Sequence, residues 1–445
     1  MHRTGLIIAA AASALAAPVR GAEGPPARWR PLGVLEAATD EALAVGPCVA
    51  FGPDGRLWIG PSRDMDVGDG PAVVHAVTLP PAWPAKRAGW AAIAHPDADR
   101  TAGIGTSIGH AGSLVALGAP HAGCGHDACD AGMVVLHAAG SRMVTPIVPP
   151  SAEPGGRFGA AVAASGNVIA VGSPRVDGGD DLPDAGAVDV FAAEVRPGGT
   201  IDARAIARLV PPTPSTSGRF GTSVATDGER IAVGEPGAGT GTPRPGAVHV
   251  FRRHGGAWRF EVTLRASAGA VGWHGAAVAL AGANLLAGAP LARPWGAGTS
   301  RVGAVEHWQL SPAGWRRAGV LAPDDAATEG AGFGTAIALL DGMAAVGSPG
   351  DDLVGADAGA AYACDLTTGR VERLELQRAG AGDGAGAGIA IGCIPGAGDG
   401  PVRMAIAVGI RGDPESPPSP GMAECFVRGP LRLAFTPASR LRGLA

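Results

Sequence analysis

Two segments of this sequence concentrate aspartates among glycines and prolines, and clustered carboxylates are the ligands that a hard cation such as calcium prefers. The spacing of these aspartates fits no defined cation-binding loop. Aspartate, glycine and proline also form turns on a solvated surface, so the sequence leaves both interpretations open and favours the turn. The candidate ligands are Asp177, Asp180, Asp181 and Asp184 in the first segment, and Asp351, Asp352 and Asp357 in the second.

The first residues of the chain have the pattern of a secretory signal. Arg3 precedes an apolar run from Leu6 to Leu15, and the small residues Ala14 and Ala16 suit signal peptidase. The run is too short to span a bilayer and is followed by Pro18. The sequence therefore predicts a signal peptide in residues 1–22 and a mature chain that is secreted, periplasmic or at the cell surface, with no transmembrane segment.

Six cysteines in an exported protein predict disulfides. Cys124 and Cys129 lie five positions apart in a glycine-rich loop and are the easiest pair to close. The alternative is a zinc site with His121 and His126, although this spacing matches no established zinc finger. The other four cysteines, Cys48, Cys364, Cys393 and Cys425, have no unique pairing. Cys48 with Cys393 would staple the two ends of the chain, and Cys393 with Cys425 is the competing pair.

Composition limits the class of protein. A chain of 445 residues exceeds the size at which one hydrophobic core stops growing, so it holds several domains or one repetitive architecture. The 73 glycines and 39 prolines require frequent turns, while 46% hydrophobic and 17% charged residues exclude a disordered chain. A net charge of -5 gives no sign of nucleic-acid binding.

Internal repeats decide the predicted fold. Five segments align without a gap, and in each an anchor glycine is followed thirteen positions later by the glycine of a Gly-x-Pro triplet. Weaker copies at Gly46–Pro61 and Gly386–Gly409 make seven units, and the anchors from Gly105 to Gly388 recur about every 57 residues. Each unit holds four strand-like runs separated by turn residues. The sequence therefore predicts an all-β fold, a seven-bladed β-propeller of four-stranded antiparallel blades, over a β-solenoid with its shorter coils.

The repeated motifs also carry a family resemblance. Phe158-Gly159, then Gly172-Ser173-Pro174, then the strand Gly186–Phe191 resemble the FG-GAP repeat of the integrin α-subunit head, a seven-bladed propeller. The resemblance covers residues 29–428 and implies an extracellular propeller used for adhesion or ligand binding. Many FG-GAP repeats carry a calcium loop with several aspartates, whereas the corresponding turns here hold at most two carboxylates. We therefore expect calcium sites of the integrin type to be absent.

The two ends of the chain are predicted to share one blade. Trp29–Leu35 is similar to Trp315–Leu321, which the resemblance makes the outer strand of the preceding blade. The N-terminal copy should then pair with Gly421–Arg428 and close the ring. The alternative is closure by residues 431–435, in the tail formed by residues 429–445.

Motifs for enzymatic chemistry are scarce. The sequence contains no G-x-S-x-G elbow and no H-E-x-x-H pair, and Tyr362, the only tyrosine, lies at a repeat strand position. We expect an exported, non-enzymatic propeller that binds a protein or glycan through loops on one face. The alternative is a carbohydrate-active or other hydrolytic propeller whose residues come from several blades and meet in the central channel.

Overall fold

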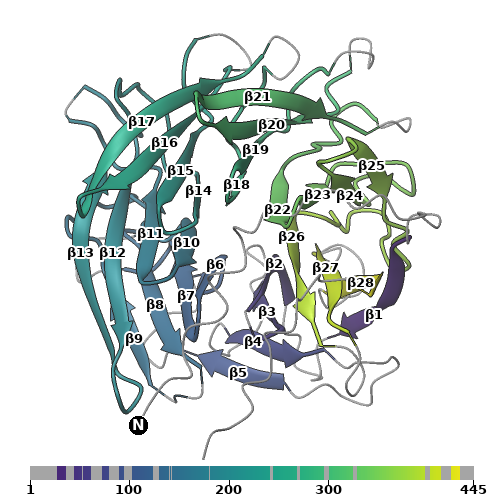
Figure 1. The fold of residues 1–445 in the computed structure, drawn as a ribbon, viewed down its shortest axis with the longest axis horizontal. Coiled ribbons are helices and arrows are strands. Elements are labelled where there is room, and N and C mark those ends of the chain that lie inside the picture. Colours follow the sequence, from purple (N-terminus) through teal and green to yellow (C-terminus); the bar gives the residue numbers. More distant parts are fainter. Residues whose placement is uncertain are drawn as a thin grey trace, which may run out of the picture.

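The computed structural model describes residues 28–430 except 37–44, 53, 62–72, 80–89, 95–102, 124–129, 140, 142, 180, 241–243, 268–270, 295–299, 324–327, 396–400 and 412–421. These residues form seven four-stranded antiparallel sheets that stand as blades around a central channel (Figure 1). The predicted fold class is therefore confirmed. The described part of the chain contains no helix, and so none long and apolar enough to cross a membrane.

Six blades each take four consecutive strands, with the first strand nearest the channel. Blades 1 to 3 comprise β2 (Val45–Phe51), β3 (Arg56–Pro61), β4 (Val73–Thr78) and β5 (Trp90–Ala94); β6 (Ser107–Ala111), β7 (Leu114–Ala119), β8 (Met133–Ala138) and β9 (Val144–Ile147); and β10 (Ala161–Ser165), β11 (Val168–Ser173), β12 (Ala187–Val195) and β13 (Ile201–Leu209). Blades 4 to 6 comprise β14 (Ser223–Thr226), β15 (Arg230–Glu235), β16 (Ala247–His254) and β17 (Ala257–Arg265); β18 (Val278–Ala281), β19 (Asn284–Ala289), β20 (Ala304–Ser311) and β21 (Gly314–Leu321); and β22 (Ala336–Leu340), β23 (Met343–Ser348), β24 (Ala360–Asp365) and β25 (Arg370–Arg373).

The seventh blade joins the two ends of the chain. It comprises β26 (Gly388–Ile394), β27 (Arg403–Ile410), β28 (Met422–Pro430) and, as its outer strand, β1 (Arg30–Glu36). Figure 1 shows β1, in purple, beside the yellow strands of the chain's end. The predicted pairing of the N-terminal strand is thus confirmed. Residues 431–445, which the alternative closure would use, lie outside the described residues.

The outer strand of blade 7 has a β-bulge that is also found in other blades. In the pairing of β1 with β28, Leu32 is an extra residue between Pro31 and Gly33. In blade 5, Ala318 is the extra residue at the same place in the similar sequence. Blades 3 and 4 carry the same bulge, at Ile206 and Glu261. Because a bulge bends and twists a strand, β1 has the shape that a continuous fourth strand would have had.

The hydrophobic core lies between neighbouring blades. The second strands of blades 2, 3 and 6 are buried along their whole length, as their almost continuously apolar sequences predict. Side chains of adjacent blades share one buried cluster there, as Val190 of blade 3 and Ile231 of blade 4 do. Nearer the rim, Trp258, Trp308 and Trp315 pack against these clusters. Large side chains at the rim fill the space between blades that diverge from the channel.

The recurring glycines are the points where two blades touch backbone to backbone. A Cβ on Gly172 would overlap the carbonyl oxygen of Gly221, the anchor glycine of the next blade. Gly118, Gly234, Gly288 and Gly347 meet the next anchor in the same way. In the seventh unit that anchor is Gly386, and not Gly388 as the alignment suggested, because Gly386 donates its N–H to Gly409 and contacts Gly347. Only glycine permits this approach.

Candidate functional site

One end of the propeller, called here the loop face, is formed by two kinds of connection. The loop between the second and third strands of a blade lies beside the connection that enters the same blade. In blade 3, Asp177 donates its N–H to Oε2 of Glu153 (3.0 Å), and in blade 6, Asp352 donates to Oγ1 of Thr328 (3.2 Å). The acidic segments therefore lie on the loop face, as the alternation of strands predicts.

The acidic loop of blade 3 uses its carboxylates to shape a turn. Oδ1 of Asp177 accepts the N–H of Asp184 at 2.9 Å. Asp184 has a φ of 52°, a left-handed conformation that aspartate tolerates better than most residues. Asp181 is exposed on the same loop, and Asp180 lies outside the described residues.

The acidic loop of blade 6 has the same turn and one buried ion pair. Oδ1 of Asp352 accepts the N–H of Asp357 (2.7 Å), and Asp357 has a φ of 49°. Asp351 is completely buried, with its carboxylate 2.6 Å from Nη2 and 3.2 Å from Nη1 of Arg373 on the outer strand. The hydroxyl of Tyr362 donates a hydrogen bond to Oδ2 of the same carboxylate at 3.4 Å. Asp351 thus ties the loop to the body of the blade.

These carboxylates do not converge on one point. Each loop turns one carboxylate onto a backbone N–H seven or five positions further on, and Asp351 points inward to a guanidinium. Among the residues that the structure describes, no three His, Cys, Asp or Glu side chains form a group that could hold a metal ion. Asp177, Asp184, Asp352 and Asp357 shape the turns of these loops, and Asp351 anchors one of them.

The cysteine pairings have mixed outcomes. Cys124 and Cys129 lie outside the described residues. Cys364, Cys393 and Cys425 are free thiols, so both pairings that used Cys393 are wrong. Burial raises the pKa of the Cys364 and Cys425 thiols to about 12, and it also raises that of Cys393. The buried thiols are therefore protonated and unreactive near neutral pH.

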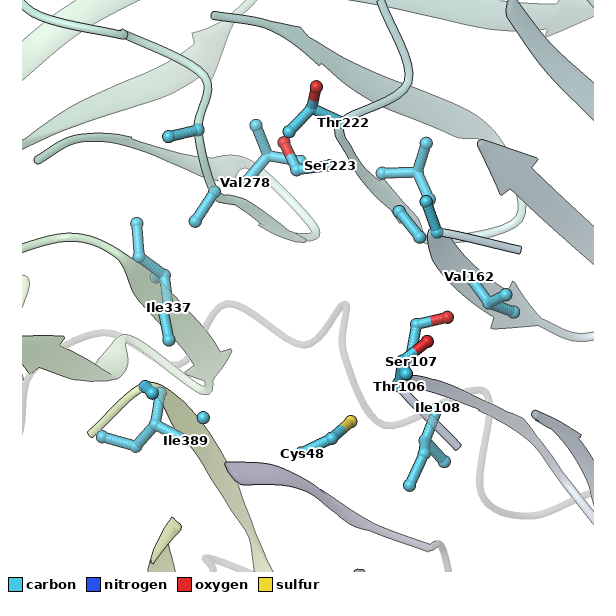
Figure 2. A pocket seen from close by; sticks show the side chains of 18 of the residues that line it. Cys48, Thr106, Ser107, Ile108, Val162, Thr222, Ser223, Val278, Ile337 and Ile389 are labelled. Atoms are coloured by element: carbon cyan, nitrogen blue, oxygen red, sulfur yellow. The ribbon is translucent and has the colours of Figure 1, made fainter. Parts of the chain in front are cut away.

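The central channel contains a cavity lined by the first strands of all seven blades (Figure 2). Its described lining is aliphatic except for serines, threonines, Cys48 and Arg411. Some of these hydroxyls donate hydrogen bonds to the backbone. Ser107 and Ser223 donate to the carbonyl oxygens of Gly159 and Gly275, both at 2.8 Å. No carboxylate or imidazole is among the described lining residues.

A comparison with protein families matches two segments, residues 204–251 and 315–364, to the FG-GAP repeat. The first runs from within β13 to within β16, and the second from within β21 to within β24. Each match thus begins in the outer strand of one blade and ends in the third strand of the next. The chain carries FG-GAP repeats. No curated protein matches it.

The FG-GAP motifs of this chain act together at five junctions between blades, from blades 2 and 3 to blades 6 and 7. The Phe-Gly residue pair forms a parallel bridge to the preceding blade, as Phe220 does to Gly186, and His274 or Ala385 replaces phenylalanine in two of the copies. The Gly-x-Pro glycine of the preceding blade then contacts the anchor glycine. The FG-GAP signature therefore encodes contact between blades, and the similarity to integrin α-subunits rests on this architecture.

Two buried His–Glu pairs near the junction of blades 4 and 5 were not anticipated from the sequence. In blade 4, Nε2 of His249 is 2.7 Å from Oε2 of Glu235, and Thr263 lies 3.1 Å from Nδ1. In blade 5, Nε2 of His274 is 3.1 Å from Oε2 of Glu306. Burial raises the pKa of Glu306, but hydrogen bonds from His274 and Ser267 outweigh it and lower the pKa overall.

One signal in the sequence marked the first pair. Glu235 occupies the place of Ser173 and Ser348 in the other Gly-x-Pro triplets, so a charged residue stands where the repeats have a small one. Both of those serines are buried, and Glu235 is buried with them. A buried glutamate needs a partner, and His249 supplies it.

Proposed function

We propose that this chain is an exported, non-enzymatic propeller that binds a protein partner through its loop face. The observation that carries the proposal is the loop of blade 6. Leu353 and Val354 form its tip and are 53% and 66% exposed. Asp351 anchors the base of the loop, and its Oδ1 also accepts the N–H of Leu353 at 3.1 Å. Apolar side chains held out on a fixed loop are suited to a protein interface.

Other apolar side chains are exposed on the same face. Trp273 is 44% exposed in the connection between blades 4 and 5, and Val210 is 51% exposed in the connection between blades 3 and 4. Tryptophan is among the residues that dominate binding energy at protein interfaces. Asp352 and Asp357 flank the apolar tip of blade 6, so a partner with basic residues around an apolar patch would complement it.

The chemistry of the channel favours binding over the hydrolytic alternative. Glycoside hydrolysis ordinarily needs two carboxyl groups on opposite sides of the scissile bond. Arg411 is the one charged residue in the described lining of the channel cavity. That lining offers no acid and base pair, and the proposal therefore rests on the loops.

The test compares two faces of the same propeller. The double variant Leu353→Ser with Val354→Ser changes the loop face, and Val195→Ser, at a 40% exposed position in a hairpin on the opposite face, is the matched control. Immobilised protein is screened against purified surface and secreted proteins and against a glycan array. We expect a protein ligand whose binding the double variant reduces at least tenfold while the control retains it. A ligand bound equally by all three proteins, or a glycan alone, contradicts the proposal.

Export is tested separately on the precursor expressed in its own cells. We expect the extracytoplasmic protein to lack the first residues, with a new N-terminus after Ala16 or near Ala22. A chain that keeps Met1 and stays with the cytoplasmic fraction would contradict export but leave the loop-face test intact.

A further inference from the structure

The loop face is basic over blades 4 and 5. Its segments there are residues 210–219, 236–245, 266–273 and 290–301, which contain no aspartate or glutamate. The charged residues of this basic sector are Arg219, Arg244, Arg293 and Arg301. The adjoining acids are Asp184, whose carbonyl oxygen accepts the N–H of Arg219, and Glu329, whose carboxylate accepts the N–H of Arg301 at 2.8 Å. An anion near the loop face is therefore attracted to this sector.

Arg244 holds two segments of the basic sector together. Its Nη1 donates to the carbonyl oxygens of Thr216 and Gly237, at 2.8 and 2.7 Å. Gly237 in turn donates its N–H to the carbonyl oxygen of Gly218 at 3.0 Å, directly beside Arg219. Arg244 thus fixes the backbone around Arg219.

Trp273 lies between the loops of blades 4 and 5. It donates its N–H to the carbonyl oxygen of Arg244 at 3.0 Å. On the side of blade 5, Leu291 donates its N–H to the carbonyl oxygen of Gly272 at 3.3 Å, and a Cβ on Gly272 would overlap the backbone of Leu291. Arg293 follows two positions after Leu291. Backbone contacts therefore join Trp273 to the arginines of both blades.

Two guanidinium groups of the sector are available to a ligand. Arg219 and Arg293 are exposed, and neither side chain forms a salt bridge or a hydrogen bond with any residue that the structure describes. A guanidinium has five N–H donors and binds a carboxylate or another planar group of anionic oxygens through two of them. A ligand with anionic groups would satisfy both.

The backbone is strained where Arg219 and Trp273 stand. Their φ angles are 56° and 62°, a left-handed conformation that disfavours side chains, and bulky ones most. At the same place blade 3 has Arg157, and blades 2, 6 and 7 have Gly103, Gly332 and Gly384. Burial does not offset this strain fully, because Arg219 is exposed and Trp273 is 44% exposed. Strain at exposed side chains is typical of binding sites.

The rest of the basic sector suits a glycan better than a protein. Apart from Trp273, its exposed large apolar side chains in the described residues are Val210 and Val271, which is little for the core of a protein interface. Glycine, proline, serine and threonine predominate instead, and the side chains of Thr213 and Thr216 are exposed. Hydroxyl groups both donate to and accept from sugar hydroxyls, and the C–H face of a pyranose ring packs against an indole.

We propose that the loop face over blades 4 and 5 binds an acidic polysaccharide, with a sugar ring on Trp273 and carboxylate or sulfate groups at Arg219 and Arg293. This goes beyond the proposed function, whose protein partner is assigned to the tip of blade 6. The variant Leu353→Ser with Val354→Ser should therefore leave glycan binding unchanged. In the screen described above, the protein ligand decides the proposed function and the acidic glycans decide this proposal, so either can fail alone.

The first experiment is calorimetry on the unmodified protein with four probes. Hexagalacturonate carries carboxylates, a heparin hexasaccharide carries sulfates as well, cellohexaose is neutral, and poly-L-glutamate is an anion without sugar. We expect hexagalacturonate or the heparin hexasaccharide to bind at least tenfold more tightly than the last two. The proposal is overturned if neither acidic glycan binds, or if cellohexaose binds as well. Equal affinity for poly-L-glutamate would also overturn it and assign the sector to an acidic protein segment.

The second experiment places the glycan on the propeller. Trp273→Gly and Arg219→Gly introduce the residue that three other blades have at this place, so the backbone is retained. We expect Trp273→Gly to weaken the acidic glycan at least tenfold and Arg219→Gly about three- to tenfold. Arg252→Gln removes the same charge from an exposed strand end on the opposite face and should change nothing.

Thermal melting of the same variants separates binding from stability. Arg219→Gly should melt no lower than the unmodified protein, because glycine relieves the left-handed backbone and the lost side chain is exposed. A fall in melting temperature with full glycan affinity would give Arg219 a structural role and refute its part in binding. Glycan affinity that neither glycine variant changes would place the ligand elsewhere and overturn the proposal.

Discussion

Gly172 lies directly against the carbonyl oxygen of Gly221 in the next blade, with no space for a side chain between them. The same contact recurs around the ring at the glycines that the sequence repeats. Each of these glycines therefore sets how closely two blades approach, and together they set the curvature of the ring.

Gly172→Ala should consequently force blades 3 and 4 apart. We expect a loss of about 2–4 kcal/mol in the free energy of unfolding, measured by urea denaturation, because backbone has to move to admit the methyl group. Gly319→Ala is the control: a Cβ at Gly319 would meet nothing within 4 Å, and stability should change by less than about 0.5 kcal/mol. Similar losses for both variants would show that the contact is unimportant.

The closing strand should be essential to the whole propeller. Deleting Trp29–Leu35 removes β1, exposes the edge of β28 and uncovers the core that contains Leu32 and Leu35. We expect a large fall in melting temperature and a tendency to aggregate through the open edge. Ending the chain after Pro430 should be mild. The reverse ranking of the two truncations would show that the C-terminal residues close the ring.

Asp351 should matter more than the other loop aspartates. Asp351→Asn leaves Arg373 without its buried carboxylate, and we expect about 2–4 kcal/mol of destabilisation. Asp177→Asn, at an exposed position, should cost less than about 1 kcal/mol. Thermal melts of the two variants would disprove the anchoring role of Asp351 if they coincide.

Stability should fall on mild acidification, partly through His110. Burial lowers the pKa of His110 from 6.5 to about 4, and Asp54 opposes this only in part. Between these two values the unfolded chain binds a proton that the folded protein does not, so stability is lost as pH falls from 6.5 to 4. The slope from this residue is at most about 1.4 kcal/mol per pH unit.

His110→Gln should therefore flatten the stability profile between pH 6.5 and 4. Gly319→Ala, which removes no ionisable group and meets nothing within 4 Å, should leave the slope of the profile as it is. Urea denaturation at several pH values measures both variants. An unchanged slope in His110→Gln would mean that other groups cause the acid sensitivity.

Calcium should have little effect on stability. Asp177 and Asp352 each accept a backbone N–H and Asp351 binds Arg373, so these three carboxylates already have partners. A tightly bound cation would add about 3 kcal/mol at a hundredfold excess over its dissociation constant. We expect melting temperatures in calcium and in chelator to agree within about 2 °C. A large shift that Asp181→Asn abolishes would instead establish a site at the loop of blade 3.

The number and order of blades could be predicted because the repeated glycines mark contacts between backbones. A larger residue does not fit at such a contact. The glycines can therefore be recognised in every repeat, even where the residues around them differ. The closing strand was also predictable, because the sequence of Trp29–Leu35 is similar to that of the strand that contains the bulge in blade 5. Local sequence patterns were therefore sufficient to predict the number of blades and the strand that closes the ring.

Contacts between distant positions could not be predicted in this way. In the sequence, Asp351 is one of several aspartates in the acidic loops. It anchors its loop only because it pairs with Arg373 of the outer strand. The pairing of Cys48 with Cys393 failed for a related reason. Gly388, and not Cys393, is the counterpart of Cys48, and five residues of extended chain, roughly 16 Å, separate Gly388 from Cys393.

Cys393 and Cys425 are separated by a whole strand. Cys393 faces Met404 on β27, and Cys425 faces Ala407 on the opposite side of that strand. Two strand spacings, roughly 9.6 Å, exceed the Cα separation that a disulfide can bridge. The prediction that Cys393 and Cys425 lie in one blade was correct, but two cysteines in one blade are not necessarily close enough to form a disulfide.

The union of β1 and β28 also dictates when the propeller can be finished. Both strands of this pair come from opposite ends of the polypeptide, so the contact has the greatest loop-closure cost in the molecule. During synthesis the first strand emerges early and waits for a partner that emerges last. Six blades can assemble in order, while Leu32 and Leu35 stay exposed until β28 is available. Closure of the ring therefore waits for the last strand of the propeller, and the interval before it is when the chain most needs protection from aggregation.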